Sequence, residues 1–208
     1  MSTQSSTYVP QPLSFAFTPA YREKAAAAIA KYPEGRQASA CMALLDLAQR
    51  QEGWLSRAAM DHVAETLGMP PIRVYEVATF YTMYVLQPIG KHHVQVCTNL
   101  PCWLRGSDEI LRACKDALGV SPGETTSDGL FTVNEVECAG TCVNAPMIQV
   151  GDDTYEDLDY ESAKKVLEAL KRGEKPKVGS QTGRQCSCPA GGPTTLKKVP
   201  GADVKGGA

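Results

Sequence analysis

The hydrophobic pattern of this 208-residue chain changes once, near residues 87–90, and this change constrains the fold more than any other feature. Before it, apolar residues recur every three or four positions, as in helices. After it, short alternating runs are followed by helical spacing, as in strands followed by helices. The fold class we expect is α+β, with two domains flanked by an extended arm and a tail. The expected ranges are 1–17 for the N-terminal arm, 18–88 for a small helical bundle, 89–173 for a mixed domain and 174–208 for an extended basic tail.

Four helices are expected in the bundle, separated by breaks that contain proline or glycine. Their ranges are about 19–31, 37–51, 57–67 and 72–84. Thr18 and Ser56 are the expected caps of the first and third helices, because a hydroxyl oxygen there can accept a free backbone N–H. The last helix ends in an aromatic run that we expect to lie in the bundle core: Tyr75, Phe80, Tyr81 and Tyr84.

The pattern of the second domain predicts strand, helix, three strands and helix. The expected ranges are 92–96, 107–118, 131–136, 147–150, 154–158 and 159–170. Ser107 and Asp159 are the expected caps of the two helices. A small sheet with helices packed on it is close to a thioredoxin-like layout.

Composition excludes several classes of function. The formal net charge is -2, so the chain lacks the basic excess that binding to nucleic acid requires. Its apolar stretches fall short of the roughly 20 residues that a membrane-spanning helix needs, and its first residues resemble neither a secretory signal nor a transit peptide. We therefore expect a reducing compartment, where some of the eight cysteines are metal ligands or redox groups.

Four cysteines form two pairs, and each pair follows an expected strand. The pairs are Cys97 with Cys102, and Cys138 with Cys142. If the two strands are neighbours, all four sulfur atoms can meet at one edge of the sheet. Loops rich in proline, glycine and polar residues are poor places for cysteines that act only as small apolar side chains.

Spacing favours a 2Fe-2S cluster over zinc but leaves structural zinc open. A single zinc ion is usually gripped by pairs with two intervening residues, whereas spacings of three and four suit two irons, one for each pair. The three histidines lie outside both loops, which excludes a Rieske centre, and a thioredoxin-type CxxC is absent. Cys41 and Cys114 fall on apolar helix faces and are expected in the core.

Longer sequence segments around these cysteines resemble those of a known family. The segments are ATFYTMY (78–84), VQVCTNLPCWLRGSDEIL (94–111), LFTVNEVECAGTCVNAPMIQVGDD (130–153) and YEDL (155–158). The chain resembles the NuoE family, the thioredoxin-like 2Fe-2S subunit in the peripheral arm of respiratory complex I. The resemblance implies that one 2Fe-2S cluster is held by Cys97, Cys102, Cys138 and Cys142.

The resemblance also implies the partners and the place of the protein. A NuoF-like subunit would hold FMN and bind NADH, a NuoG-like subunit would carry further iron–sulfur clusters, and the chain would supply no bond-making residue of its own. The location would be the cytoplasmic face of the bacterial inner membrane, or the matrix side in a mitochondrion. The alternatives are the corresponding subunit of a soluble NAD-linked formate dehydrogenase or hydrogenase, and a zinc-stabilised adaptor.

The last 37 residues carry a net charge of +5, with 8 glycines and 4 prolines. Such a segment cannot build a core of its own, so we expect it to be disordered or to become ordered along an acidic partner. It contains Cys186 and Cys188, which we interpret as non-ligands because two cysteines on a flexible segment supply too few ligands.

Overall fold

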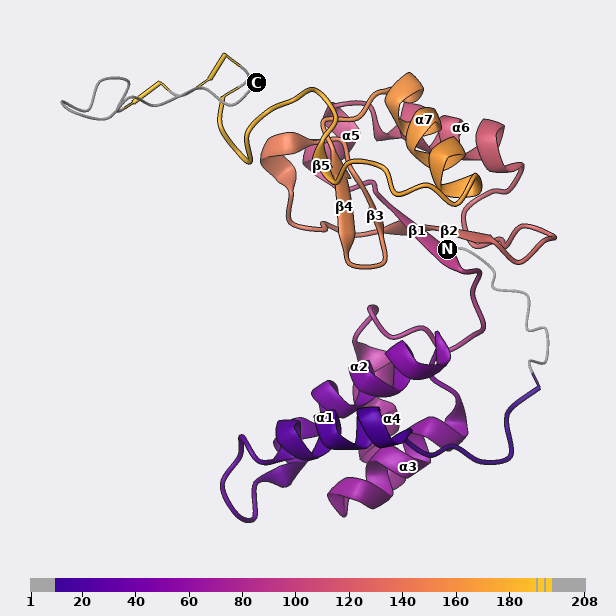
Figure 1. Cartoon of the computed structure of the whole chain (residues 1–208), viewed down its shortest axis with the longest axis vertical. Coiled ribbons are helices and arrows are strands. Elements are labelled where there is room, and N and C mark those ends of the chain that lie inside the picture. The colour runs from indigo at the N-terminus through magenta and orange to yellow at the C-terminus, as the bar shows by residue number, and fades with distance from the viewer. Residues whose placement is uncertain (1–9, 190, 193, 196–208) are drawn as a thin grey trace. The chain divides into compact units, whose positions relative to one another are not determined.

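The computed structural model describes residues 10–189, 191–192 and 194–195, so parts of the expected arm and tail lie outside the described residues. The chain divides into two compact units, the first ending at Lys91 and the second beginning at His92 (Figure 1). Each unit has its own cluster of buried apolar side chains. The two units are therefore described separately.

The first unit is a bundle of helices, as expected. Its elements are α1 (Pro19–Ile29), the short 3-10 helix η1 (Gln37–Ala40), α2 (Cys41–Glu52), α3 (Arg57–Leu67) and α4 (Pro71–Phe80). The Ser56 hydroxyl accepts the Ala59 N–H at 3.2 Å, which confirms this cap. The prediction that the Thr18 side chain caps α1 is wrong. Thr18 is at the cap position, but its side chain accepts no hydrogen bond from the helix backbone. Its backbone N–H donates to Gln51 Oε1 (2.9 Å).

The prediction for the aromatic run is correct for Tyr84 and wrong for two of its neighbours. Tyr84 is buried and its hydroxyl donates to the carbonyl of Met42 (2.9 Å). Phe80 and Tyr81 are 77% and 40% exposed. Phe80 is the last residue of the helix and lies two positions after the buried Ala78, off the buried face. The backbone of Tyr81 is extended, so helical spacing no longer applies from that residue on.

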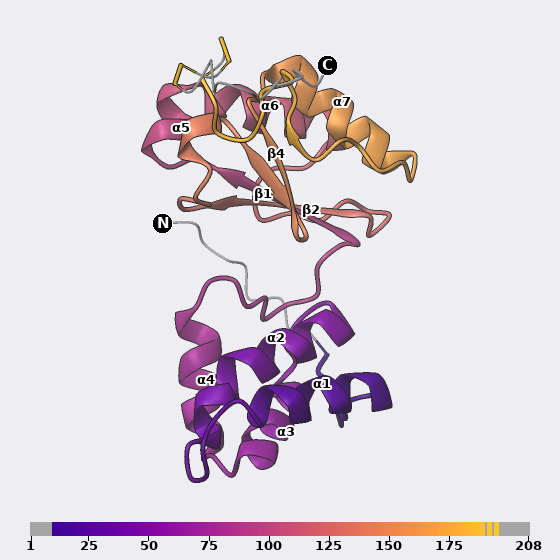
Figure 2. The same ribbon diagram turned by 60° about the vertical axis from the view of Figure 1, so that its left-hand side comes forward.

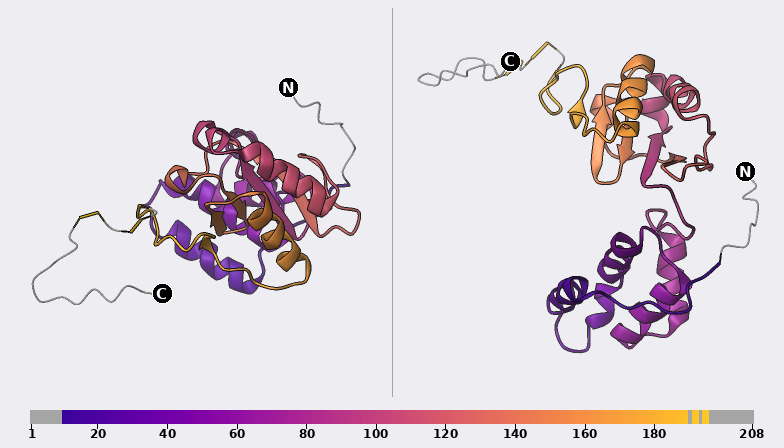
Figure 3. Two further views of the ribbon diagram at one scale, coloured as in Figure 1. Left: turned by 90° about the horizontal axis from the view of Figure 1, so that it is seen from above. Right: turned by 45° about the vertical axis from the view of Figure 1, so that its right-hand side comes forward.

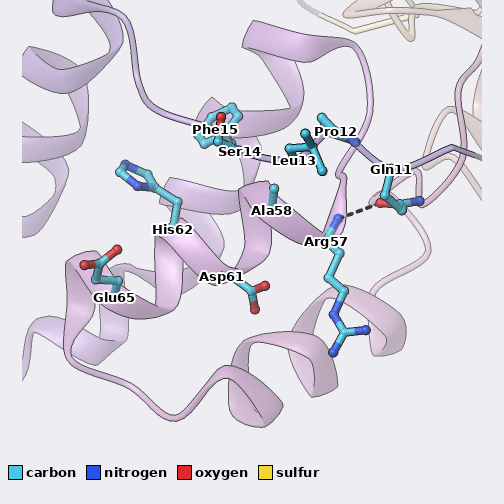
Figure 4. Close-up of a pocket in the computed structure, with 10 residues that line it drawn as sticks. All are labelled: Gln11, Pro12, Leu13, Ser14, Phe15, Arg57, Ala58, Asp61, His62 and Glu65. Carbon is cyan, nitrogen blue, oxygen red and sulfur yellow. Dashed lines mark hydrogen bonds between the residues drawn. The ribbon is translucent and has the colours of Figure 1, made fainter.

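An N-terminal segment lies against α3 in the same unit (Figure 4). The Arg57 N–H donates to Gln11 Oε1 at 2.9 Å, and the His62 ring makes edge contacts with Phe15 and Phe17. The segment and the helix line a hollow of about 340 Å³. None of the four paired cysteines lines it.

The second unit is built on a five-stranded sheet in the order β2-β1-β3-β4-β5. The strands are β1 (His92–Cys97), β2 (Phe131–Val136), β3 (Ile148–Val150), β4 (Asp153–Glu156) and β5 (Gly179–Ser180). β1 is parallel to β2 and antiparallel to β3, β3 is antiparallel to β4, and β4 is parallel to β5.

Helices α6 (Ser107–Leu118) and α7 (Tyr160–Lys171) lie side by side over the sheet (Figures 1 and 2). Asp159 caps α7, accepting the Ser162 N–H at 2.8 Å, as predicted. Ser107 does not cap α6. The cap position is Gly106, whose φ of 96° is left-handed, and Ser107 is already the first helical residue.

The beginning of the tail is ordered on the sheet, contrary to the expectation of disorder. β5 pairs with β4, and the Gln181 N–H donates to the Glu156 carbonyl (2.9 Å), so the tail extends the sheet by one short strand (Figure 3). The partner that orders these described tail residues is the chain's own second unit. Within residues 10–189, no helix has both the length and the apolar character of a membrane span.

Candidate metal centre

The two cysteine loops leave the same edge of the sheet because β1 and β2 are parallel neighbours. Cys97 is the last residue of β1 and stands opposite Val136, the last residue of β2. Cys138 follows just beyond the end of β2. The Thr98 N–H donates to the Val136 carbonyl (3.2 Å), so the strands stay paired up to the point where the loops begin. The two cysteine pairs can converge only if the strands before them are neighbours, and the structure meets this condition.

The first pair is brought together by α5 (Leu100–Leu104), a helix of five residues that the sequence pattern did not predict. Asn99 starts this helix, since its side-chain oxygen accepts the Leu100 N–H (2.8 Å). One helical turn carries the chain back to Cys102, which packs with Cys97 and Met147, and both thiols are buried. Burial, together with the adjacent Cys97 thiol, raises the pKa of Cys102 to about 12.

The second pair is exposed and in direct contact. The sulfur atoms of Cys138 and Cys142 are 3.3 Å apart. Gly140 between them has a φ of 90°, a conformation in which a side chain would be strained, and this lets the loop turn back on itself. The Gly140 N–H bonded to Cys138 lowers the pKa of that thiol, whereas the contact with Cys138 raises the pKa of Cys142.

Polar contacts hold the two loops in place. Asn99 Nδ2 donates to Glu137 Oε2 (2.6 Å), and Arg105 Nε donates to the Ala145 carbonyl (3.4 Å). The proximity of Cys97 also raises the pKa of Cys142, because two thiolates close together disfavour each other. Sequence reasoning missed these supporting residues. An asparagine two positions before Pro101 was the one available signal for a helix start.

Cys41 and Cys114 are not part of this arrangement. Cys41 and Cys114 are buried in the cores of the first and second units, as predicted. Cys186 and Cys188 lie in the tail. In the described part of the chain, no group of three or more Cys, His, Asp or Glu side chains is arranged to hold a single metal ion. The four thiols stand as two pairs, and two thiolates for each iron are the donor set of a 2Fe-2S cluster.

A small mixed sheet with four cysteines at the ends of two parallel strands defines a protein of the iron–sulfur ferredoxin class. Residues 25–171 match the family model for the thioredoxin-like [2Fe-2S] ferredoxin. A subunit of the NADH-quinone oxidoreductase of Rickettsia prowazekii is 53% identical over 156 residues, which cover 74% of this chain and 88% of the relative. The chain therefore belongs to the thioredoxin-like [2Fe-2S] ferredoxin family, with relatives named as subunits of that enzyme, and the resemblance seen in the sequence is confirmed.

A second relative extends the match further along the chain. The mitochondrial NADH dehydrogenase [ubiquinone] flavoprotein 2 of Dictyostelium discoideum is 49% identical over 187 residues, which cover 89% of this chain and 76% of the relative. Among solved structures, an NAD⁺-reducing [NiFe]-hydrogenase matches 62% of this chain and 23% of its own, with a TM-score of 0.54 and 19% identity. That likeness establishes the shared fold alone.

Proposed function

We propose that the chain is the 2Fe-2S electron-carrying subunit of an NADH:quinone oxidoreductase. The single observation that carries this proposal is the pairing of four thiols at one sheet edge, in a chain about half identical to relatives named for that enzyme. The proposed cluster ligands are Cys97, Cys102, Cys138 and Cys142. The protein takes part in an oxidoreductase as a subunit, and it contributes no side chain that makes or breaks a substrate bond.

The chemistry that such a cluster supplies when bound is the uptake and release of one electron at a time. All-cysteine clusters of the plant type have potentials of about -400 mV, within reach of a flavin reduced by NADH. The protein's own part is to set the surroundings of the sulfur atoms. It buries Cys97 and Cys102 among apolar side chains and leaves Cys138 and Cys142 open to water, and both burial and hydrogen bonding tune the potential.

Exposed apolar side chains beside the cysteines support a docking role. Leu100, Trp103 and Leu104 on α5 and Val143 next to Cys142 are all more than half exposed. Apolar and aromatic side chains are enriched at the centres of protein interfaces. We propose that this rim meets the FMN- and NADH-binding subunit, with the large iron–sulfur subunit as a further neighbour. The proposed location is the cytoplasmic side of a bacterial inner membrane, or the matrix side in a mitochondrion.

The test is metal analysis of the full chain purified without oxygen. We expect about two irons and two acid-labile sulfides per chain, and a rhombic paramagnetic resonance signal after reduction. Replacing any one proposed ligand by serine should lower the iron content, whereas Cys114→Ser, in the core, should keep it. A colourless preparation with one zinc per chain would refute the redox function. Isolation in a complex with a soluble hydrogenase or formate dehydrogenase, rather than a quinone reductase, would refute the assignment of the parent enzyme.

A further inference from the structure

The ordered part of the tail contacts the turn that carries Cys142. This turn is the 3-10 helix η2 (Cys142–Asn144), which ends two residues after the cysteine. Asn144 is buried, and its side-chain Nδ2 donates to the carbonyl of Cys186 at 2.8 Å and to Glu156 Oε2 at 2.7 Å. One amide group therefore joins the cysteine turn, β4 and the tail.

A second connection runs through Asp157, just after β4. Its backbone N–H donates to the Asn144 carbonyl at 2.7 Å. Its carboxylate accepts the Ser180 hydroxyl at 2.7 Å and pairs with Arg184 at 2.9 Å, and the Asp157 and Arg184 side chains are only 4% and 15% exposed. Asp157 has a φ of 52°, a strained conformation for a residue with a side chain, which persists where surrounding contacts fix it.

The turn itself has little local support. The backbone bonds formed within the loop itself run from the Asn144 N–H to the Thr141 carbonyl (2.9 Å) and from the Ala145 N–H to the Cys142 carbonyl (3.4 Å). The Cys142 side chain is exposed, so packing does not hold it. A 3-10 turn of three residues is weakly stable alone. The contacts to β4 and the tail therefore supply much of what fixes the backbone at Cys142.

The tail segment also forms one wall of a cavity beside this turn. The cavity measures about 590 Å³ and is lined by Thr141 and Val143 from the cysteine loop, by Glu156 from β4, and by Arg184 and Cys186 from the tail. Without the segment, the cavity beside the cysteine loop would lose this wall. Solvent access is one of the factors that set the potential of an iron–sulfur site.

We infer that residues 180–188 act as a strap that holds the turn carrying Cys142, with Arg184 and Asn144 as positioning residues for this ligand. The inference rests on the proposed ligation by Cys142. It assigns the tail a role within its own subunit, in place of the expected role along a partner. The strap fixes the backbone at the exposed pair, and the buried pair is held by α5 and its core contacts.

The test compares Arg184→Gln with Lys175→Gln in the full chain. Both variants remove one positive charge from the tail, but Lys175 is exposed and lies outside both the strap and the lining of the cavity. We expect Arg184→Gln to lose iron to a chelator roughly tenfold faster, because it loses a charge-assisted hydrogen bond, and to shift the resonance signal of the reduced cluster. Lys175→Gln should match the native protein. Arg184→Lys should restore part of the iron retention.

Hydrogen exchange at residues 142–147 provides a measurement that does not depend on metal. These amides should exchange faster in Arg184→Gln than in Lys175→Gln. If Arg184→Gln does not fold, Ser180→Ala, which removes one hydroxyl donor to Asp157, should show the same changes at smaller size. Equal iron loss and equal exchange in the variants and the native protein would overturn the strap. A native chain without iron would refute the proposed function, while the exchange comparison would still decide whether the strap holds the turn.

Discussion

The cysteines outside the two pairs differ in burial, and we therefore expect them to differ in reactivity. Burial raises the pKa of Cys114 to about 12, and it also raises the pKa of Cys41, whereas Cys186 is exposed. At pH 8 about one in ten thousand Cys114 thiols would be ionised, and the thiolate is the reactive form. We expect iodoacetamide to modify Cys186 in the folded protein and to spare Cys114 and Cys41. Peptide mass spectrometry measures this directly, with a denatured sample as control, and rapid modification of Cys114 in the folded chain would contradict it.

His93 makes the stability of the second unit depend on pH. Its ring bonds to Asn134 Oδ1 at 3.0 Å, and burial lowers its pKa despite this acceptor. Below the unfolded pKa of about 6.5, the unfolded chain takes up a proton that the folded chain does not, so stability falls as pH drops through this range. The slope for one proton is at most about 1.4 kcal/mol per pH unit. Denaturant unfolding at pH 7.5 and 5.5 should show this loss in the native protein and a smaller one in His93→Gln, and equal losses would exclude His93 as the source.

The elements that the sequence predicted well are those with a full period of buried side chains. In β1, alternate residues Val94 and Val96 are buried in the core, and in α7 apolar residues recur on one face over three turns. The predicted bounds of both elements are therefore within one residue of the observed bounds. α5 and β5 were missed because five and two residues are too short to show any period. Their formation depends on tertiary contacts, such as the pairing of β5 with β4.

The candidate site shows the same difference between features that a local sequence pattern predicts and features that depend on tertiary contacts. The sequence points to the four candidate cysteines through their spacing and their position after strands, because metal ligation depends on residue type. Their supports could not be predicted, because they act through tertiary geometry that no local pattern encodes. Asn99 bonds to Glu137 across a separation of 38 residues, and Arg184 reaches from the tail to the buried carboxylate of Asp157.

The cap of α7 can be tested by itself. Asp159 accepts from the backbone and the hydroxyl of Ser162, and these bonds lower the pKa of Asp159. A lowered carboxyl pKa means that the stabilisation is complete at neutral pH and is lost in acid, as pH falls below about 4. Asp159→Ala should therefore destabilise the second unit by about 1 kcal/mol at pH 7. Thermal unfolding measures this, with Glu161→Ala in the same first turn as control, and equal effects of the two changes would argue against the cap.

At the scale of the whole chain, the two units differ in what they contribute. The helical unit has a core of its own but contains none of the four proposed ligands. All four, and every residue of the strap, lie in the second unit, whose core is formed by the sheet with α6 and α7. The proposed site therefore lies within one unit, and we expect folding of that unit to be enough for metal binding.

A chain that begins at His92 should accordingly keep the cluster. We expect residues 92–208 produced alone to hold the same iron per chain as the full protein, because the contacts that hold the cysteine loops fall within this range. Residues 1–91 should fold as a helical domain without iron. Iron analysis and circular dichroism of the two fragments measure this, with Cys97→Ser in the shorter chain as the control that should lose iron. A fragment 92–208 that folds but stays free of iron would mean that the helical unit takes part in forming the site.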